Sequence, residues 1–191
     1  MSTGSSPSAG DVTTTAPAAS SEESWRSHQL AGVWCPPGSR TPSATPDPLN
    51  ARSETVASKP FFLGPWRPRR CLIPADGFYE WRPPDTQGPQ TRSARKHPYW
   101  IRRQNHGHFW LGGLWDRWSS PDGSSLETCC ILTTTANALL RPIHDRMPVV
   151  IPDGLEDTWL LASGADELRS LEPLLLPWQP AGWEAAPVDL S

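Results

Sequence analysis

Metal-binding and nucleotide-binding motifs are missing from this sequence of 191 residues. Its four cysteines, Cys35, Cys71, Cys129 and Cys130, form no CxxC pair and show no Cys/His metal spacing, which argues against a zinc site. No glycine-rich loop that could cradle phosphates is present either. We therefore expect no metal and no cofactor. The neighbouring side chains of Cys129 and Cys130 would point to opposite faces of a strand, so we expect two small buried residues rather than a disulfide.

Long hydrophobic runs are also missing. No segment approaches the apolar length of a membrane-spanning helix. The N-terminus has neither the basic start nor the apolar core of a signal peptide. These features predict a soluble, cytoplasmic protein in a reducing setting, with no membrane partner.

An excess of positive charge is lacking as well. The formal net charge is -3, which argues against a protein that wraps long duplex DNA. The basic residues nevertheless cluster, so a local basic groove is one interpretation and a set of solvated loop charges is the other. The clusters are Arg67, Arg69 and Arg70, then Arg92, Arg95 and Lys96, then Arg102 and Arg103.

Proline, glycine and tryptophan are, in contrast, abundant. With 23 prolines and 14 glycines, the chain should contain few long helices and many loops. The 11 tryptophans either fill a small core or provide stacking surfaces, and core packing is the commoner role of any single one. The length fits one domain.

Three regions of different character follow one another along the chain. Residues 1–24 are mostly Ser, Thr, Ala and Gly, and they should form a disordered tail because they offer little apolar surface to bury. Residues 25–48 are proline-rich and irregular, with no strand or helix period. Over 49–191, β-branched and aromatic runs alternate with Pro/Gly breaks and then give way to helical patterns. The sequence thus predicts an α+β, mostly β, compact single domain with a few short helices.

The expected strands and helices all lie in this last region. Strands are predicted at 70–73, 77–81, 99–102, 109–115, 128–134 and 149–151, with a polar loop over 83–96. A helical turn is predicted at 137–142, helices at 153–161 and 165–176, and a final edge strand over 183–190.

Polar residues interrupt the apolar pattern first at the string NARSET, which begins at Asn50. On an extended chain Asn50 and Arg52 face the same side. Arginine offers a forked donor and asparagine a directional amide, so together they can hold a phosphate or a sugar oxygen. A helix start or a surface loop is the alternative interpretation.

The second interruption is Glu80, which lies among Phe78, Tyr79 and Trp81 after a Pro/Gly turn. A carboxyl group against apolar neighbours tends to have a raised pKa, which suits proton transfer near neutral pH. A glutamate on the solvent face of an edge strand is the alternative.

The third interruption runs from Thr133 to Pro148. His144 follows the predicted helical turn and precedes a strand, and loops are where functional residues concentrate. A histidine with an adjacent aspartate and arginine can shuttle protons or bind an oxyanion, although a lone histidine is more often structural.

Each of these signals is weak alone, but their order is specific. The strings NARSET, RCLIPADGFYEW, FWLGGLWDRW and LTTTAN…IHDRMPVVI resemble the SRAP (SOS response-associated peptidase) family of abasic-site processing proteins. The resemblance covers roughly Leu49 to Asp189.

The resemblance implies a compact β-rich domain that binds single-stranded DNA in a basic groove and takes part in the DNA-damage (SOS) response as a monomer. Family members form a covalent DNA–protein cross-link through an N-terminal cysteine, and they combine peptidase-like self-processing with abasic-site lyase or cross-linking activity. Glu80 and His144 match the family's proton-transfer residues. Asn50, Arg52 and Thr133 match residues at the DNA site, and Arg70 is expected to be a further groove arginine.

The chain departs from the family at its start. It begins Met1-Ser2-Thr3-Gly4 where the family begins Met-Cys-Gly-Arg, and the family's early strands are not recognisable. One permissible set of codons for Leu30 to Pro37 reads as RWGLVPP in another frame, so residues 25–48 are a candidate out-of-frame segment. Cys35 lacks the α-amine that a thiazolidine needs.

Two further interpretations stay open. The chain could be a non-catalytic single-strand binder that keeps groove arginines such as Arg52 and Arg70 and stacking residues such as Trp66. It could also be an inactive product that does not fold stably, because the loss of core strands removes the small free energy that stabilises a domain of this size.

Overall fold

The computed structural model describes residues 12–16, 26–30, 50–84, 96–120 and 122–189. Most of the strands form one sheet in the order β2-β1-β4-β7-β8-β3, with β10 beside β7 and β9 beside β8. The strands of this larger sheet are β1 (Val12–Ala16), β2 (Arg26–Leu30), β3 (Asn50–Arg52), β4 (Arg70–Ala75), β7 (Phe109–Ser119), β8 (Ser125–Thr135), β9 (Arg146–Pro148) and β10 (Val150–Ile151).

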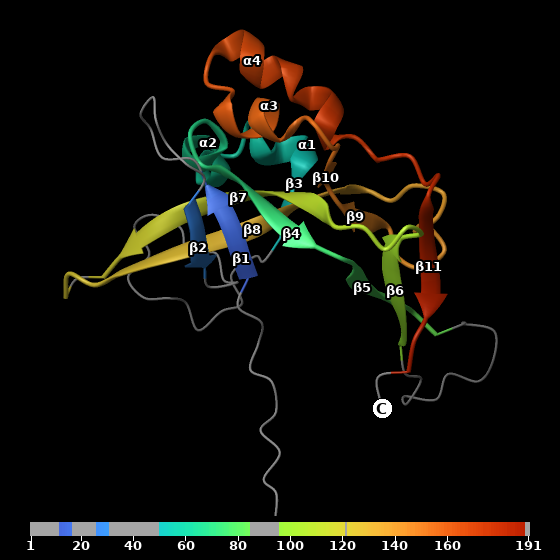
Figure 1. Cartoon of the computed structure of the whole chain (residues 1–191). Helices are drawn as coiled ribbons and strands as arrows, with labels where there is room; N and C mark the ends of the chain where they lie inside the picture. Colours follow the sequence, from blue (N-terminus) through green and yellow to red (C-terminus); the bar gives the residue numbers. More distant parts are fainter. Residues whose placement is uncertain (1–11, 17–25, 31–49, 85–95, 121, 190–191) are drawn as a thin grey trace, which may run out of the picture.

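A smaller sheet of three strands, in the order β11-β6-β5, lies beside the larger one (Figure 1). It consists of β5 (Phe78–Arg82), β6 (His97–Arg103) and β11 (Trp183–Pro187). The short helices gather on one face of the larger sheet (Figure 1). They are α1 (Ser53–Val56), α2 (Pro60–Trp66), α3 (Glu156–Leu161), α4 (Ala165–Ser170) and the 3-10 helix η1 (Glu172–Leu175). The predicted α+β, mostly β fold with short helices is confirmed.

The middle of the larger sheet is buried on both faces. Successive side chains of a strand point to opposite faces, and accordingly Leu72 packs in the cluster beneath the helices while Cys71 and Ile73 pack in a second cluster with Phe78 of the smaller sheet. Cys130 and Cys129 divide between the same two clusters and are 1% and 4% exposed. The prediction of two buried cysteines on opposite faces is confirmed.

The predicted strands after residue 70 all exist, most of them longer than expected. The long strands β7 and β8 pair in antiparallel register from Gly113 opposite Ile131 to Ser119 opposite Ser125. The predicted strand at 149–151 is shortened to β10, and β9 precedes it, paired with the end of β8. The helix predicted at 165–176 is divided into α4 and η1, because Pro173 lacks the backbone N–H that a continuous α-helix needs. The final strand lies at the edge of its sheet, as expected.

Two strands occur where none was predicted. β1 and β2 pair with each other, and β1 contacts β4 at Thr15 opposite Leu72. The expectation of no strand before residue 49 is therefore wrong for 12–16 and 26–30. The reason is local: Val12 to Thr15 is a run of β-branched residues, which favour strands. The rest of the predicted tail, the candidate out-of-frame residues 31–48 and loop residues 85–95 lie outside the described residues.

Candidate functional site

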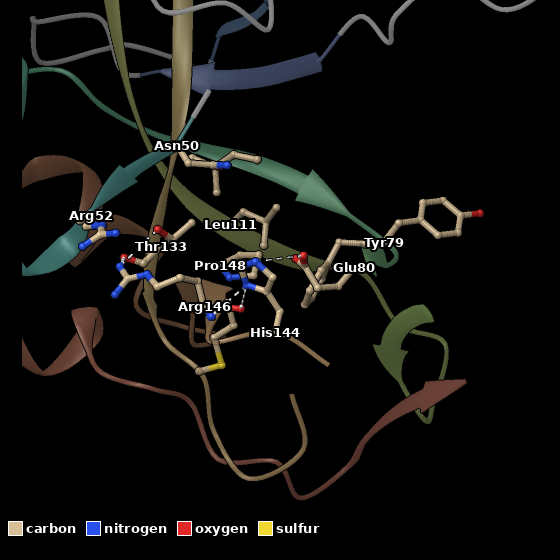
Figure 2. A pocket seen from close by; sticks show the side chains of 12 residues that line it. Asn50, Arg52, Tyr79, Glu80, Leu111, Thr133, His144, Arg146 and Pro148 are labelled. Atoms are coloured by element: carbon tan, nitrogen blue, oxygen red, sulfur yellow. Dashed lines mark hydrogen bonds and ion pairs between the residues drawn. The ribbon is translucent and has the colours of Figure 1, made fainter. Parts of the chain in front are cut away.

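A cavity of about 440 Å³ opens between the end of the larger sheet and strand β5 of the smaller one. Its polar wall contains Asn50, Arg52, Glu80, Thr133 and His144, which are five of the six site residues predicted from the sequence, together with Arg146 (Figure 2). Its apolar lining comes from Phe78, Leu111, Ile131 and Met147. A concave, partly apolar site with a few convergent polar groups is the usual form of a ligand pocket.

Strand β3 delivers Asn50 and Arg52 to this cavity. It pairs in parallel with β8, so that Asn50 lies beside Ile131 and Arg52 beside Thr133. Both polar side chains are exposed, while Ala51 between them is 2% exposed. The predicted shared face of the two residues is confirmed.

Glu80 faces His144 across the cavity (Figure 2). Glu80 Oε1 lies 3.9 Å from His144 Nε2, although 64 positions separate the two residues in the chain. Burial raises the pKa of the Glu80 carboxyl above its ordinary value, and the nearby His144 opposes part of that rise. A carboxylate whose pKa is shifted toward neutrality beside an imidazole is an arrangement suited to general acid–base chemistry.

Several groups surround His144 Nδ1. The Arg146 backbone N–H donates to it at 3.0 Å, which favours the neutral tautomer with the proton on Nε2, the nitrogen that faces Glu80. The Asp145 carboxylate lies 3.2 Å from Nδ1 and its side chain is 87% exposed, which places a solvated negative charge beside the ring.

From the sequence, Arg146 was considered only as the arginine beside His144 and was not among the predicted site residues. Its guanidinium pairs with both carboxylate oxygens of Glu54, at 2.5 and 2.9 Å. It also donates to the backbone carbonyl of Thr133 at 2.5 Å and to its hydroxyl at 3.3 Å. These bonds tie α1, β8 and β9 together along one side of the cavity.

The prediction that Arg70 contacts DNA is wrong. Its side chain is 1% exposed and donates to backbone carbonyls at the ends of α2 and α3. The acceptors are the carbonyl oxygens of Trp66, Arg67, Trp159, Leu160 and Ala162. Burial lowers the pKa of Arg70 to about 10, and the group remains charged at neutral pH. Arg70 therefore satisfies the last carbonyls of two helices, a structural role.

Trp66 likewise belongs to the core rather than to a stacking surface. It is 4% exposed and packs edge-on against Trp159, with ring centroids 5.9 Å apart. The exposed aromatic rings are instead Tyr79 and Trp81 on β5, at 44% and 43% exposure. Their side chains alternate with that of Glu80, and Tyr79 points away from the cavity centre (Figure 2).

In the part of the chain that the structure describes, thiols and metal ligands do not converge on the cavity. Among the described residues, no group of three or more His, Cys, Asp or Glu side chains could hold a metal ion. Cys71, Cys129 and Cys130 are buried, and burial raises the pKa of the Cys129 thiol to about 11. Ser2 and Cys35 lie outside the described residues. No helix in the described part of the chain is long and apolar enough to span a bilayer.

The two-sheet fold is shared with solved proteins. A protein from Bordetella bronchiseptica superposes with a TM-score of 0.74 at 28% identity, covering 94% of this chain and 84% of that one. A protein from Bacteroides thetaiotaomicron gives a TM-score of 0.63 at 31% identity, over 74% of this chain and 58% of that one.

The sequence model of the family described as SOS response associated peptidase (SRAP) matches residues 10–191, and the chain belongs to this family. The match begins before Leu49, so it includes β1 and β2. Abasic site processing protein YoqW of Bacillus subtilis is 41% identical over 141 residues, which cover 74% of this chain and 59% of the relative. Abasic site processing protein HMCES of Gallus gallus is 36% identical, over 58% of this chain and 37% of the relative. The chain thus spans less than two thirds of these relatives' length.

Proposed function

We propose that this protein binds single-stranded DNA at abasic sites and promotes opening of the abasic sugar to its aldehyde. The observation that carries the proposal is one cavity that combines the Glu80–His144 pair with the exposed guanidinium of Arg52. Membership of the SRAP family and the names of the relatives support abasic-site processing as the function. The setting we propose is the cytoplasm, with a single chain as the working unit.

The DNA backbone fits the polar side of the cavity. Arg52 and Asn50 share the exposed face of β3, where a forked donor and an amide can bind a phosphate and a sugar oxygen. The apolar lining favours a sugar that has lost its base, because an intact nucleotide would bring additional polar groups into contact with Leu111 and Ile131. Tyr79 and Trp81, exposed beside the cavity, offer rings for flanking bases.

The proton transfers follow from the geometry of the pair. An abasic sugar exists mainly as a ring with a hydroxyl on C1′. Glu80, as carboxylate, takes the proton of that hydroxyl, and the ring oxygen takes the Nε2 proton of His144. The proton held by Glu80 then returns to Nε2, 3.9 Å away, so that both residues end in the protonation state in which they began. The bond from C1′ to the ring oxygen breaks, the C1′ carbonyl forms, and the ring oxygen becomes the C4′ hydroxyl.

A covalent adduct is a separate step. In the family it needs an N-terminal cysteine, whereas position 2 of this chain is Ser2. The described residues that line the cavity include neither a lysine nor a cysteine. We propose that the described cavity residues bind and open the abasic site by themselves, and that a stable thiazolidine requires a cysteine with a free α-amine, since a serine hydroxyl closes only a labile ring.

The proposal is tested by incubating the purified chain with single-stranded DNA that carries one abasic site. Binding is measured by fluorescence anisotropy, and adducts are sought on a denaturing gel. We expect the protein to bind the DNA and to form no protein–DNA adduct that survives heat and SDS. Glu80→Ala and His144→Ala should slow trapping of the aldehyde by an alkoxyamine probe, and a double variant with Ser2→Cys and Thr3→Gly tests whether a cysteine restores a stable adduct. Absence of any DNA binding would contradict the proposal.

The second candidate function is single-strand binding without chemistry, which the exposed rings of Tyr79 and Trp81 favour. It predicts strongly salt-dependent binding and the same rate of aldehyde trapping with and without the protein. The trapping rate therefore separates the two functions. A cooperative unfolding transition, measured in the same preparation, tests the third interpretation of an inactive, unstable product.

A further inference from the structure

Two arginines line the cavity, but their surroundings differ. Arg52 is exposed, and its charge contributes to lowering the pKa of Glu54, although no hydrogen bond joins these two side chains in the described parts of the chain. The Arg146 side chain is 17% exposed, and both of its terminal nitrogens bond to Glu54 of α1, while its buried Nε has no hydrogen-bond partner among the described residues. The two guanidinium groups are therefore not equally available to a DNA phosphate.

The partner of Arg146 is Glu54, which comes from α1, 92 positions earlier in the chain. Both oxygens of the carboxylate meet the two terminal nitrogens of the guanidinium, at 2.5 and 2.9 Å. The bond to Arg146 is the main cause of a lowered pKa of Glu54, so the carboxylate stays ionised at neutral pH. On the strand side, the backbone carbonyl and the hydroxyl of Thr133 accept from Nη2 of Arg146.

A phosphate would use the same donors. Arginine binds carboxylates and phosphates through the same two-nitrogen fork, so the two anions compete for one guanidinium. A DNA phosphate can reach the fork of Arg146 only by displacing Glu54, and the departing carboxylate would then repel the phosphate that replaced it.

We propose that Glu54 is a specificity-determining residue that withholds Arg146 from phosphate binding, leaving Arg52 as the guanidinium that meets the DNA backbone. Held in this way, Arg146 keeps its backbone N–H on His144 Nδ1 and supports the imidazole rather than the DNA. The electrostatic attraction to intact single strands is thereby limited. The preference for abasic over intact DNA then depends more on the sugar that enters the cavity. This inference rests on the proposed function.

The test is Glu54→Gln, which keeps the shape of the side chain and removes its charge. With Arg146 released to phosphate, the affinity for an intact single strand should rise, and the slope of log affinity against log salt should steepen by about 0.7, the value for one additional bound phosphate. The double variant Glu54→Gln/Arg146→Met should return the slope to that of the wild type. Glu172→Gln, an exposed carboxylate on η1, is the matched control for a general loss of negative charge. An unchanged or shallower slope in Glu54→Gln would overturn the inference.

A second measurement separates this inference from the proposed function. In a ¹⁵N NMR titration with inorganic phosphate, the Arg52 side-chain resonance of the wild type should shift and that of Arg146 should not, whereas both should shift in Glu54→Gln. Arg146 shifting in the wild type overturns the inference even if no DNA binds. Failure of the wild type to bind any DNA would overturn the proposed function alone.

Discussion

Arg70 begins β4 and Arg52 ends β3, and these two arginines lie in two regions that use charge in opposite ways. On the helix-covered side, Arg70 is 1% exposed and bonds only to backbone carbonyls. At the sheet junction, Arg52 is exposed beside a polar cavity. The first guanidinium is committed to the fold and the second remains available to a ligand. The difference shows that an arginine's role here depends on what covers it.

The largest expected effect concerns the chemistry of the cavity. Glu80→Gln should slow sugar opening by about 10²- to 10⁴-fold, the usual contribution of a positioned general base. Because the folded-state pKa of Glu80 is raised, its ionised form is lost as the pH falls through that higher value. As the pH is lowered, the wild-type rate should therefore begin to fall at a higher pH than it would if Glu80 had an ordinary pKa. This fall in rate at low pH should be absent in Glu80→Gln. Single-turnover trapping of the aldehyde across pH gives both quantities.

The matched control for that experiment is Glu172→Gln, which should keep the wild-type rate and pH profile. If Glu80→Gln and the control behave alike, the cavity does not act as an acid–base site. The sheet junction would then not differ from the helix-covered side by having a chemical role.

The next effect concerns stability. Arg70→Met should lower the free energy of unfolding by about 3 kcal/mol or more, because several buried carbonyls lose their donor at once. Arg52→Met should change it by less than about 0.5 kcal/mol, as exposed substitutions usually do. Urea denaturation of the two variants measures the contrast directly. Equal losses in both variants would show that Arg52 also belongs to the fold.

A smaller effect is expected in DNA binding. Arg52→Ala should weaken binding to single strands and reduce the salt slope by about 0.7, the value expected when one phosphate is no longer neutralised. Arg67→Ala, exposed at the end of α2, is the matched control and should leave the slope unchanged. Anisotropy titrations at several salt concentrations provide the slopes. A reduced slope in Arg67→Ala would move the DNA site to the helix-covered side.

The smallest effect concerns Asp116 on β7, which is 1% exposed and paired with Arg69. Its Oδ2 atom has no hydrogen-bond partner among the described residues, and burial raises its pKa. A raised folded-state pKa favours the protonated form, so the stability contributed by this site is lost as the pH rises through that pKa. Asp116→Asn should therefore gain stability relative to the wild type at neutral pH and lose that gain in acid. Urea denaturation at both pH values checks it, and a gain independent of pH would contradict this explanation.

Much of the cavity could be predicted because its signals are local. Alternation along β3 placed Asn50 and Arg52 on one face, and apolar neighbours marked Glu80 as unusual. The contact between Glu80 and His144 could not be predicted from local patterns, because it depends on how the smaller sheet meets β9. The misassignment of Arg70 has the same cause, since three of its five acceptors lie at the end of α3, some 90 positions later. Strand β1 was missed because its β-branched run lies within small, polar sequence, and β2 was missed because it has no β-branched residue.

The most direct test is a comparison of two oligonucleotides that differ at one position. Each is a short single strand, one with a stable tetrahydrofuran analogue of an abasic site and the other with thymidine at the same place. The wild type should bind the abasic strand more tightly, and Leu111→Trp, which fills the cavity, should abolish this preference while leaving affinity for the thymidine strand unchanged. Equal affinity of the wild type for both strands, or a preference that survives Leu111→Trp, would contradict the assignment of the cavity to the abasic sugar.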